Sequence, residues 1–537
     1  MTKHDAVLDT GSWLRGVLVW SGYRAELGEI KSWDLKVVQL SDSRQGLSVF
    51  RGHMERGNGF GQVVLLDDAY NLHKTISADK KGQSLDAHDF HLLDNGQNAI
   101  VLRYLPVQQD LTSKGLEDSF GWVYNSNFKE YELDTGKVLF EWNSIDHVSI
   151  KESVVSPKVK LGTAKSFTKP WDYFHINSVD KFENGDYLVS ARHTNCIYRI
   201  SHQDGSIIWR LGGTKSTFTL NGFNFSSQHD ARIRKAVDGE EQISLFNNAW
   251  NGNVQTRDYS SAMLVELDSI SMTASLVNEW LPLEGGLARH QGNVRFLDNG
   301  NVFVGWGGIP SFTEFASNGD RVLDVAFSDN TTLNYRTIKQ DWVGRPDTQP
   351  DLYIYSRSET DPTYFYMSWN GATEVANWEV YGVVDNSLDP VLLGSAKKEG
   401  FETRYNTSAK ISAGFVKALD HSNNILSTSE IITTIVPPSN LGCQPQHCSA
   451  HSQQLQRQSD VVGYIKPAGF MNAKHPAGIP ALASDGSQRW GAIVIGAVTL
   501  LGVGFWAGRF TRRLKWKVLD LLPANVKYTP LEQRIVV

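Results

Sequence analysis

The sequence predicts an all-β protein built around a β-propeller, and two observations carry this prediction. Short apolar strands are separated by Asn-Gly and Asp-Gly pairs, which supply the positive φ that tight hairpin turns need. The same strand-and-turn pattern then returns several times along the chain. Because one four-stranded sheet cannot bury both of its faces alone, repeated sheets of this size are expected to stack radially.

The clearest unit lies between residues 171 and 213. Strand 175–179, turn 183–185 and strand 186–193 form one predicted hairpin, and a further strand at 206–211 follows the Asp-Gly pair. A turn followed by an apolar strand returns at 134–142 and 318–324, and Asn-Gly followed by an apolar strand returns at 95–103 and 299–306. These copies predict several four-stranded antiparallel sheets with polar groups at their rims.

Composition sets limits on size and partners. A chain of 537 residues is long enough for two or three domains, and its Trp and Tyr content suits β structure. The net charge is only −6, and no basic stripe runs through the propeller region. Nucleic acid is therefore not an expected partner.

Composition and strand pattern divide the chain into six segments. After the predicted propeller, short strand-like runs favour a fibronectin-type or immunoglobulin-like sandwich, and a stretch rich in Pro, Ser, Gln and Gly then predicts a disordered stalk. The expected segments are an unassigned extension at 1–34, the propeller at 35–345, the sandwich at 346–436, the stalk at 437–489, a transmembrane helix at 490–508 and a cytoplasmic tail at 509–537.

The predicted membrane helix rests on an uncharged run from Gly491 to Gly508. Eighteen residues at about 1.5 Å rise each just cross a hydrocarbon core of roughly 30 Å. A buried helix is the alternative, but Arg509, Arg512 and Arg513 follow immediately and favour a membrane boundary. The positive-inside rule then places the tail in the cytoplasm and the large N-terminal part outside it, in the secretory pathway or at the cell surface.

The N-terminus does not match that topology, because no signal peptide opens the chain. Residues 13–20 are too short for one and contain Arg15. Either a first exon is missing from the sequence or the span inserts late as a tail anchor, and we favour the first explanation. Sequons at Asn224, Asn330 and Asn406 would be glycosylated in a lumenal protein.

Two of the three cysteines lie close together in the predicted stalk. Cys443 and Cys448 predict a small disulfide loop in an oxidising compartment. His447 and His451 lie beside them, so a zinc site is the alternative. Cys196 lies on a predicted strand and is expected to be buried.

Six motifs in a fixed order carry a resemblance to a known family. They are the segments 57–61, 87–96, 171–213, 225–232, 243–248 and 291–294. From about residue 33 to about residue 434 the chain resembles the arylsulfotransferase family, specifically its fungal-type branch. The resemblance implies a six-bladed propeller that moves a sulfuryl group from an aryl sulfate to a phenolic acceptor. It implies neither a nucleotide sulfate donor nor any other cofactor.

The resemblance also assigns roles to five residues. His229, in Gln-His-Asp, matches the histidine that becomes transiently sulfated, and His175 with Asn177 matches a sulfate-binding pair. Arg192 matches the arginine of the same pocket, and His88 matches a further pocket histidine. No metal is expected there.

These residue types suit the chemistry. A neutral imidazole can act as nucleophile or as base, and a guanidinium is a planar fork that fits an oxyanion. Their role remains open, because propeller histidines also hydrogen-bond neighbouring strands. A catalytically inactive, membrane-anchored scaffold that binds a glycan or a protein is therefore the main alternative, and a hydrolase or lyase in the same pocket is a third. Convergence of the side chains on one cavity would favour an enzyme.

Three neighbouring features are expected to be structural. His193 should point to the opposite face of its strand from Arg192, and His290 should lie in a loop. The glycine-rich run 57–61 is followed by a strand and not by a helix, so it predicts a turn at a blade edge rather than a dinucleotide site.

Overall fold

The computed structural model describes residues 11–14, 17–22, 31–78, 83–116, 120–158, 162–237, 240–327, 334–384, 387, 389–437 and 534–536. In these residues strands dominate, with one short α-helix, α1 (Ser144–His147), and four 3-10 turns. The all-β prediction is confirmed. The 3-10 turns are Asp94–Gly96, Thr112–Lys114, Ile150–Glu152 and Arg192–Thr194.

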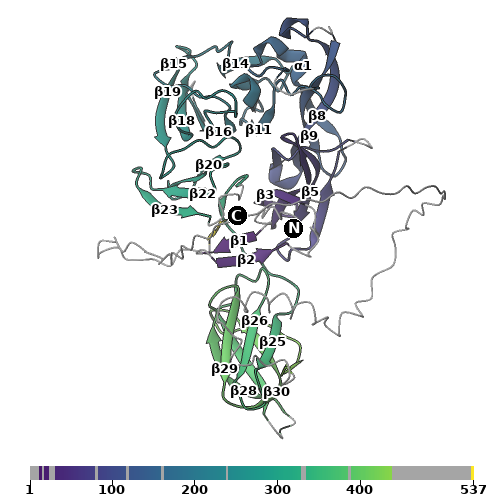
Figure 1. Ribbon diagram of the computed structural model, residues 1–537, viewed down its shortest axis with the longest axis vertical. Coiled ribbons are helices and arrows are strands. Elements are labelled where there is room, and N and C mark those ends of the chain that lie inside the picture. The colour runs from purple at the N-terminus through teal and green to yellow at the C-terminus, as the bar shows by residue number, and fades with distance from the viewer. Residues whose placement is uncertain are drawn as a thin grey trace, which may run out of the picture. The chain divides into compact units, whose positions relative to one another are not determined.

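Four antiparallel sheets each consist of four consecutive strands (Figure 1). The first contains β3 (Lys31–Gln39), β4 (Gln45–Glu55), β5 (Asn58–Leu66) and β6 (Leu72–Ile76). The second contains β7 (Phe90–Leu93), β8 (Asn98–Asp110), β9 (Phe120–Glu132) and β10 (Val138–Asn143). The third contains β11 (Ile176–Lys181), β12 (Tyr187–Ala191), β13 (Cys196–Ile200) and β14 (Ile207–Gly212). The fourth contains β20 (Asn293–Phe296), β21 (Val302–Gly305), β22 (Ser311–Phe315) and β23 (Arg321–Ala326).

Two further sheets vary this plan. One has the order β15-β19-β18-β17-β16, with β15 added parallel to β19. Its strands are β15 (Thr219–Asn221), β16 (His229–Val237), β17 (Glu240–Asn247), β18 (Ser261–Asp268) and β19 (Thr273–Trp280). The other has the order β2-β1-β33-β24 and brings distant parts of the sequence together. Its strands are β1 (Gly11–Leu14), β2 (Val17–Ser21), β24 (Lys339–Asp341) and β33 (Arg534–Val536).

This last sheet differs from the sequence-based division in two places. Strands β1 and β2 lie in the extension that was left unassigned, and β33 lies in the segment predicted to be a cytoplasmic tail. Their pairing is a long-range property, because neither segment contains the turn signals that identify the consecutive hairpins.

The hydrophobic cores lie between neighbouring sheets. The β7–β10 sheet packs against the β11–β14 sheet through ring pairs such as Phe128 and Tyr187, whose centroids are 5.0 Å apart. Phe246 of β17 and Trp306, just after β21, form a similar pair at 5.9 Å. Shared cores also join the first sheet to the second, the third to the β15–β19 sheet, and the first to residues around Trp342. This face-to-face stacking of consecutive sheets is the packing that propeller blades require.

The first strands of successive sheets run side by side. The backbone N–H of Ala231, on β16, donates to Oγ of Ser178 on β11 over 3.0 Å. On the other side of β16, the N–H of Val294 on β20 donates to Oδ2 of Asp230 over 3.3 Å. The starts of these strands therefore lie close together, so side chains from distant parts of the sequence can share one site.

The hairpin predicted at 175–193 is present, with one difference. Gly185 has φ of 95°, so the turn between β11 and β12 uses the freedom of glycine as expected. The second strand ends at Ala191, however, and Arg192–Thr194 forms a 3-10 turn. Strand alternation therefore does not fix the directions of Arg192 and His193.

Residues 351–433 form two sheets that share a separate core containing Ile354, Phe365, Trp378 and Val416. One sheet has the order β25-β26-β29, with β25 (Asp351–Ser356), β26 (Thr363–Ser368) and β29 (Glu402–Thr407). The other has the order β28-β27-β30-β31, with β32 paired to β30. Its strands are β27 (Asn377–Val384), β28 (Val391–Lys397), β30 (Ile411–Leu419), β31 (Ile425–Thr428) and β32 (Ile432–Thr433).

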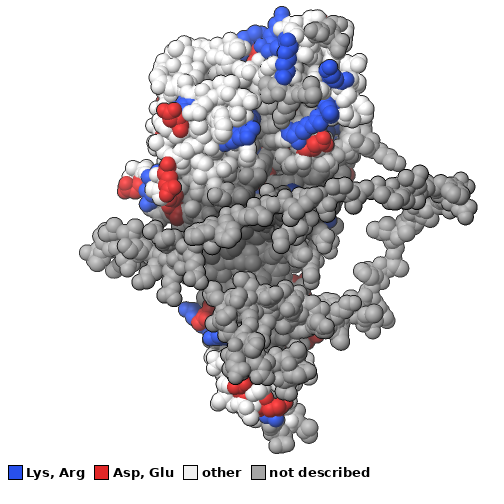
Figure 2. Space-filling view, viewed as in Figure 1, with Lys and Arg blue, Asp and Glu red and all other residues white. Residues whose placement is uncertain are grey.

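Several predictions fall outside the described residues. These are the membrane helix at 490–508, almost all of the stalk, both stalk cysteines and the sequon at Asn330. Among the helices that the structure describes, none has the length and hydropathy of a membrane span. On the face shown in Figure 2, the basic side chains of described residues form small separate groups, several of them next to acidic ones.

Candidate active site

Three histidines from three sheets meet at the starts of the inner strands. His88 precedes β7, His175 precedes β11, and His229 is the first residue of β16. The His88 ring lies with its centroid 4.7 Å from that of His175 and 6.2 Å from that of His229. All three side chains are buried. The structure therefore brings together three of the five predicted site residues.

Each of the three imidazoles is held through Nδ1. Nδ1 of His88 lies 2.6 Å from Oδ1 of Asp86, and Nδ1 of His175 lies 2.5 Å from Oδ2 of Asp172. Nδ1 of His229 lies 2.8 Å from the carbonyl oxygen of Gly292. Because a carbonyl oxygen only accepts hydrogen bonds, His229 carries its proton on Nδ1 and keeps a lone pair on Nε2. Within the described part of the chain, no hydrogen-bond partner faces Nε2 of these rings.

Burial keeps two of these rings neutral. Desolvation lowers the pKa of His229 well below its usual value, and the Arg336 guanidinium lowers it further. Desolvation also lowers the pKa of His175 well below the usual value, with His88 as the next cause. At neutral pH both groups therefore offer a lone pair rather than a positive charge.

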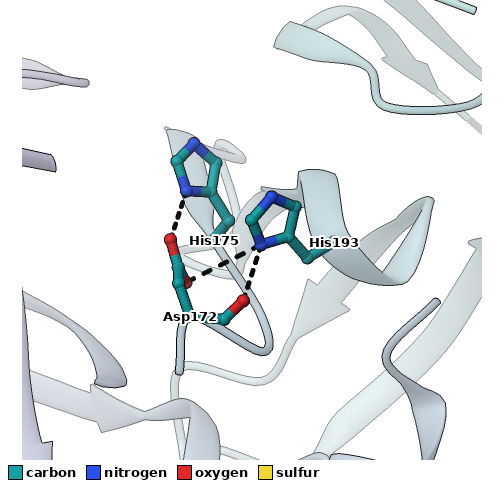
Figure 3. Close-up of side chains that lie close together, drawn as sticks. All are labelled: Asp172, His175 and His193. Atoms are coloured by element: carbon teal, nitrogen blue, oxygen red, sulfur yellow. Dashed lines mark hydrogen bonds and ion pairs between the residues drawn. The ribbon is translucent and has the colours of Figure 1, made fainter. Parts of the chain in front are cut away.

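Asp172 links His175 to a fourth histidine, as Figure 3 shows. Nδ1 of His193 lies 2.7 Å from the backbone carbonyl oxygen of Asp172 and 4.0 Å from its Oδ1. The His175 and His193 rings are 4.6 Å apart. The expectation that His193 points away is therefore wrong, because this residue lies in a 3-10 turn and not in a strand.

Burial shifts the pKa values of Asp172 and His193 in opposite directions. It raises the pKa of Asp172 to about 6, although His193 opposes the shift, and it lowers the pKa of His193 to about 3. The three side chains offer possible metal-ligand atoms within 4.8 Å of one another. Ligands of a tetrahedral ion are roughly 3.3 Å apart, whereas the His175–Asp172 contact of 2.5 Å is a short hydrogen bond. The observed arrangement therefore orients His175.

Arg192 is close to the histidines but is fully engaged elsewhere. Its Nη1 donates to the carbonyl of Ser227 and to Oδ1 of Asn248, and its Nη2 donates to the carbonyls of Trp250 and Arg289. Burial lowers its pKa to about 10, and the nearby Arg289 side chain lowers it further. With all four terminal hydrogens donated to protein oxygens, the guanidinium fork braces loops and is not presented to an anion.

Asn177 is also used between strands. The side-chain Nδ2 of Asn177 donates to the backbone carbonyl of Gln228 over 2.8 Å. The backbone carbonyl of Asn177 accepts a hydrogen bond from Nη2 of Arg336 over 3.3 Å. Its Oδ1 is buried and has no hydrogen-bond partner among the described residues. The amide thus ties β11 to the segment just before His229.

Two tyrosines that sequence reasoning did not single out complete the wall of the site. The Tyr104 ring lies 5.9 Å from His175 and 6.0 Å from His88, and its hydroxyl donates to the carbonyl of Ile176 over 2.5 Å. The Tyr335 ring lies 5.7 Å from His229, and its hydroxyl donates to the carbonyl of His88 over 2.7 Å. Burial raises the pKa of both phenols well above 10.

Three buried aspartates surround one arginine, Arg336, whose charge also acts on His229. Nη1 of Arg336, a fully buried side chain, lies 2.9 Å from Oδ1 of Asp34 and 3.3 Å from Oδ1 of Asp89, and its Nε lies 3.2 Å from Oδ1 of Asp230. Arg232 adds ion pairs to Asp89 and Asp230 at 2.9 and 2.8 Å. A repeated sequence signal marks this core, since His88-Asp89 and His229-Asp230 each place an aspartate directly after a site histidine.

The glycine-rich run 57–61 begins in the tight turn between β4 and β5, where Gly57 has φ of 94°, and continues as the first residues of β5. The run also borders the site. A Cβ added to Gly57 would lie 3.9 Å from Cε1 of His175. The N–H of Gly59 donates to Oδ2 of Asp86 over 2.6 Å, and a Cβ there would lie only 2.4 Å from the backbone N of Ala87. Asp86 therefore holds both this loop and His88, and glycine is needed because the two backbones approach so closely.

Fold and site together define a propeller-like all-β protein with a buried histidine centre. Residues 37–328, more than half of the chain, match the family model described as arylsulfotransferase (ASST). The chain therefore belongs to the arylsulfotransferase family, which confirms the resemblance seen in the sequence.

Other comparisons are less informative. No curated protein matches the chain. Among solved structures, a streptogramin B lyase is 9% identical, with 62% of this chain and 75% of that chain covered and a TM-score of 0.30. Virginiamycin B lyase from Staphylococcus aureus is 8% identical, with 63% and 95% covered and a TM-score of 0.28. An exo-β-1,3-galactanase from Phanerochaete chrysosporium is 9% identical, with 79% and 99% covered and a TM-score of 0.31. Likeness at this level carries no argument about function.

Proposed function

We propose that this protein transfers a sulfuryl group from an aryl sulfate to a phenolic acceptor through His229. One observation carries the proposal: three buried imidazoles from three sheets lie together, each is held through Nδ1, and no described residue bonds to their Nε2 atoms. This grouping favours transfer over the alternative of an inactive glycan- or protein-binding scaffold, because it leaves one nitrogen of each ring available to a substrate.

His229 suits the role of covalent acceptor. In the first step its Nε2 attacks sulfur, the bond between sulfur and the aryl oxygen breaks, and the aryl oxide leaves. The Gly292 carbonyl holds the Nδ1 proton throughout and stabilises the positive ring that forms. Neutrality before attack is required, and the lowered pKa of His229 provides it.

His175 and His88 suit proton transfer in the second step. Each has a carboxylate on Nδ1, which orients the ring and stabilises an imidazolium. One of them takes the proton of the acceptor phenol, whose oxygen attacks sulfur as the bond from sulfur to His229 breaks. The proton then passes to solvent. In this proposal Arg192 and Asn177, which the sequence suggested as sulfate ligands, act through the loops and strands that they hold.

The test is turnover of a chromogenic aryl sulfate by the purified chain, with and without a phenol. Release of the aryl alcohol should depend on the acceptor and follow ping-pong kinetics. Since burial holds the pKa of His229 well below 6.5, protonation of this ring should not slow the first step as the pH falls from 8 to 6. Absence of acceptor-dependent release would contradict the proposed function.

The finer architecture is also a proposal. We propose a six-bladed propeller, supported by the six sheets described above, with the two sheets of residues 351–433 as a sandwich domain. We also propose that residues 490–508 cross a membrane and leave the propeller extracytoplasmic. The sequons at Asn224 and Asn406, which are exposed, would then be available for glycosylation.

A protease-protection assay on sealed microsomes tests this topology. The proposed span predicts that the propeller is shielded and the tail after residue 511 is cleaved. The pairing of β33 with β1 and β24 predicts instead that residues 534–536 share the fate of the propeller. Protection of both the propeller and residues 534–536 would overturn the single-span topology.

A further inference from the structure

The hairpin β8–β9 extends well beyond the rest of its sheet. Both strands have 13 residues, and their register runs without a shift from Asn98↔Glu132 to Asp110↔Phe120. Strand β7 pairs only with residues 98–101 of β8, and β10 pairs only with residues 127–131 of β9. Beyond these pairings β8 and β9 continue as a hairpin, here called the arm. The β9 edge of the arm is hydrogen-bonded to Ala164 and Trp171.

One face of this arm bears a row of aromatic side chains. Because strand residues alternate between faces, Tyr124, Trp122 and Phe120 share a face of β9, and the register places Tyr104 of β8 on the same face. Exposure increases along the row, from 7% for Tyr104 to 68% for Phe120. Phe167, 62% exposed, lies edge-on to Trp122 with 6.1 Å between centroids.

The inner end of the row is the histidine site itself. Tyr104 borders His88 and His175, and the Tyr124 ring lies edge-on to Tyr104 at 5.6 Å. Burial raises the pKa of Tyr124, and the Asp172 carboxylate adds to this shift, so the phenol lies near the group that orients His175. The aromatic side chains on this face thus extend from the exposed Phe120 to Tyr104 beside the proposed transfer centre.

The chemistry of the row indicates what it binds. The cross-strand neighbours on this face are Pro106, opposite Tyr124, and Gln108, opposite Trp122, and both side chains are uncharged. The charges of Glu55 and Arg56 have opposite effects on the pKa of Tyr124. Beside it, Asn58 is buried and its Oδ1 has no hydrogen-bond partner among the described residues. Uncharged rings next to an unused acceptor fit a neutral aromatic molecule with hydroxyl groups. Exposed aromatic clusters of this kind commonly mark binding sites.

We propose that the row formed by Tyr104, Tyr124, Trp122, Phe120 and Phe167 binds the distal ring of a phenolic acceptor that has two or more linked aromatic rings. The proposal rests on the proposed function for the choice of a phenol. The reacting hydroxyl lies at the histidines, while the second ring packs on Trp122 and Phe167. The chain therefore selects extended polyphenols over simple phenol.

Direct binding tests the row separately from catalysis. Calorimetric titration of the full chain, without any sulfate donor, should show tighter binding of 4-phenylphenol than of phenol. Phe167→Ala, a change at an exposed residue that leaves the fold intact, and Trp122→Ala should each raise the Kd of 4-phenylphenol by about five- to tenfold, as expected for the loss of one ring contact. The Kd of phenol should change by less than about twofold.

Tyr353→Ala is the matched control, since Tyr353 is an exposed aromatic residue on β25, far from this arm in the sequence. An unchanged Kd for 4-phenylphenol in both row variants would overturn the proposal. Tighter binding of an oligosaccharide than of 4-phenylphenol through Trp122 would overturn it in favour of a glycan site. If the row variants behave as expected but the wild-type chain turns over no aryl sulfate, the proposed function fails and the aromatic site stands.

Discussion

His229→Ala should abolish sulfuryl transfer, with a loss in rate of about 10⁴-fold or more, as is typical when a covalent nucleophile is removed. No neighbouring ring is expected to replace it without rearrangement. His88 and His175 lie before different strands, β7 and β11, and the carboxylates on their Nδ1 atoms fix both rings in place. Steady-state turnover of an aryl sulfate with a phenol measures the effect.

His193→Ala provides a comparison in the same cluster. His193 reaches the centre only through Asp172 and His175, so its removal should reduce turnover by much less. The assignment of His229 would be wrong if its alanine variant still transferred sulfuryl groups at a rate similar to that of the His193 variant.

Arg336→Met should produce the largest loss of stability. The substitution keeps much of the volume but removes the cation between Asp34, Asp89 and Asp230, all of which are buried. Breaking a buried ion pair from one side costs about 3–5 kcal/mol, because the remaining charge stays desolvated. We expect the free energy of unfolding, measured by urea denaturation, to fall by about that amount.

Arg345→Met is the matched control, since Arg345 is exposed and pairs with Glu374 and Asp68 at the surface. Such pairs contribute about 0–1 kcal/mol. Equal losses in the two variants would show that the central arginine is not required to hold the inner strands together.

The stability that the buried aspartates around Arg336 contribute should decrease in acid. Despite the cost of burial, the arginines hold the pKa of Asp89 and Asp230 well below the usual value. A carboxylate with a depressed pKa stabilises the folded state above its unfolded pKa of about 4, and that contribution is lost as the pH falls through the lower folded value. Acid therefore weakens the same contacts that Arg336→Met removes.

Local signals were sufficient to predict the strand class and the hairpin turns. Gly185 and Gly57 illustrate this, because each is a glycine at positive φ in a turn between two adjacent strands. The histidines came from the family resemblance, which matched His88, His175 and His229 through the short motifs around them. These features depend on residues that are close together in the sequence.

The rest of the site depends on contacts between distant residues. Arg192 donates hydrogen bonds to the backbone carbonyls of Ser227, Trp250 and Arg289. Every residue type has a backbone carbonyl, so the sequence does not reveal such a partner. Tyr104 reaches the centre only because β8 is unusually long. His193 was misplaced because a 3-10 turn interrupted the expected strand alternation.

The most direct test of the central claim is rapid-quench labelling with an aryl sulfate that carries radioactive sulfur. Mixing it with the wild-type chain in the absence of acceptor should trap one acid-labile sulfuryl group per chain, located by peptide mapping on His229. Adding a phenol before the quench should discharge the label. A wild-type chain that turns over without a label, or a label that persists in His229→Ala, would contradict covalent transfer through this histidine.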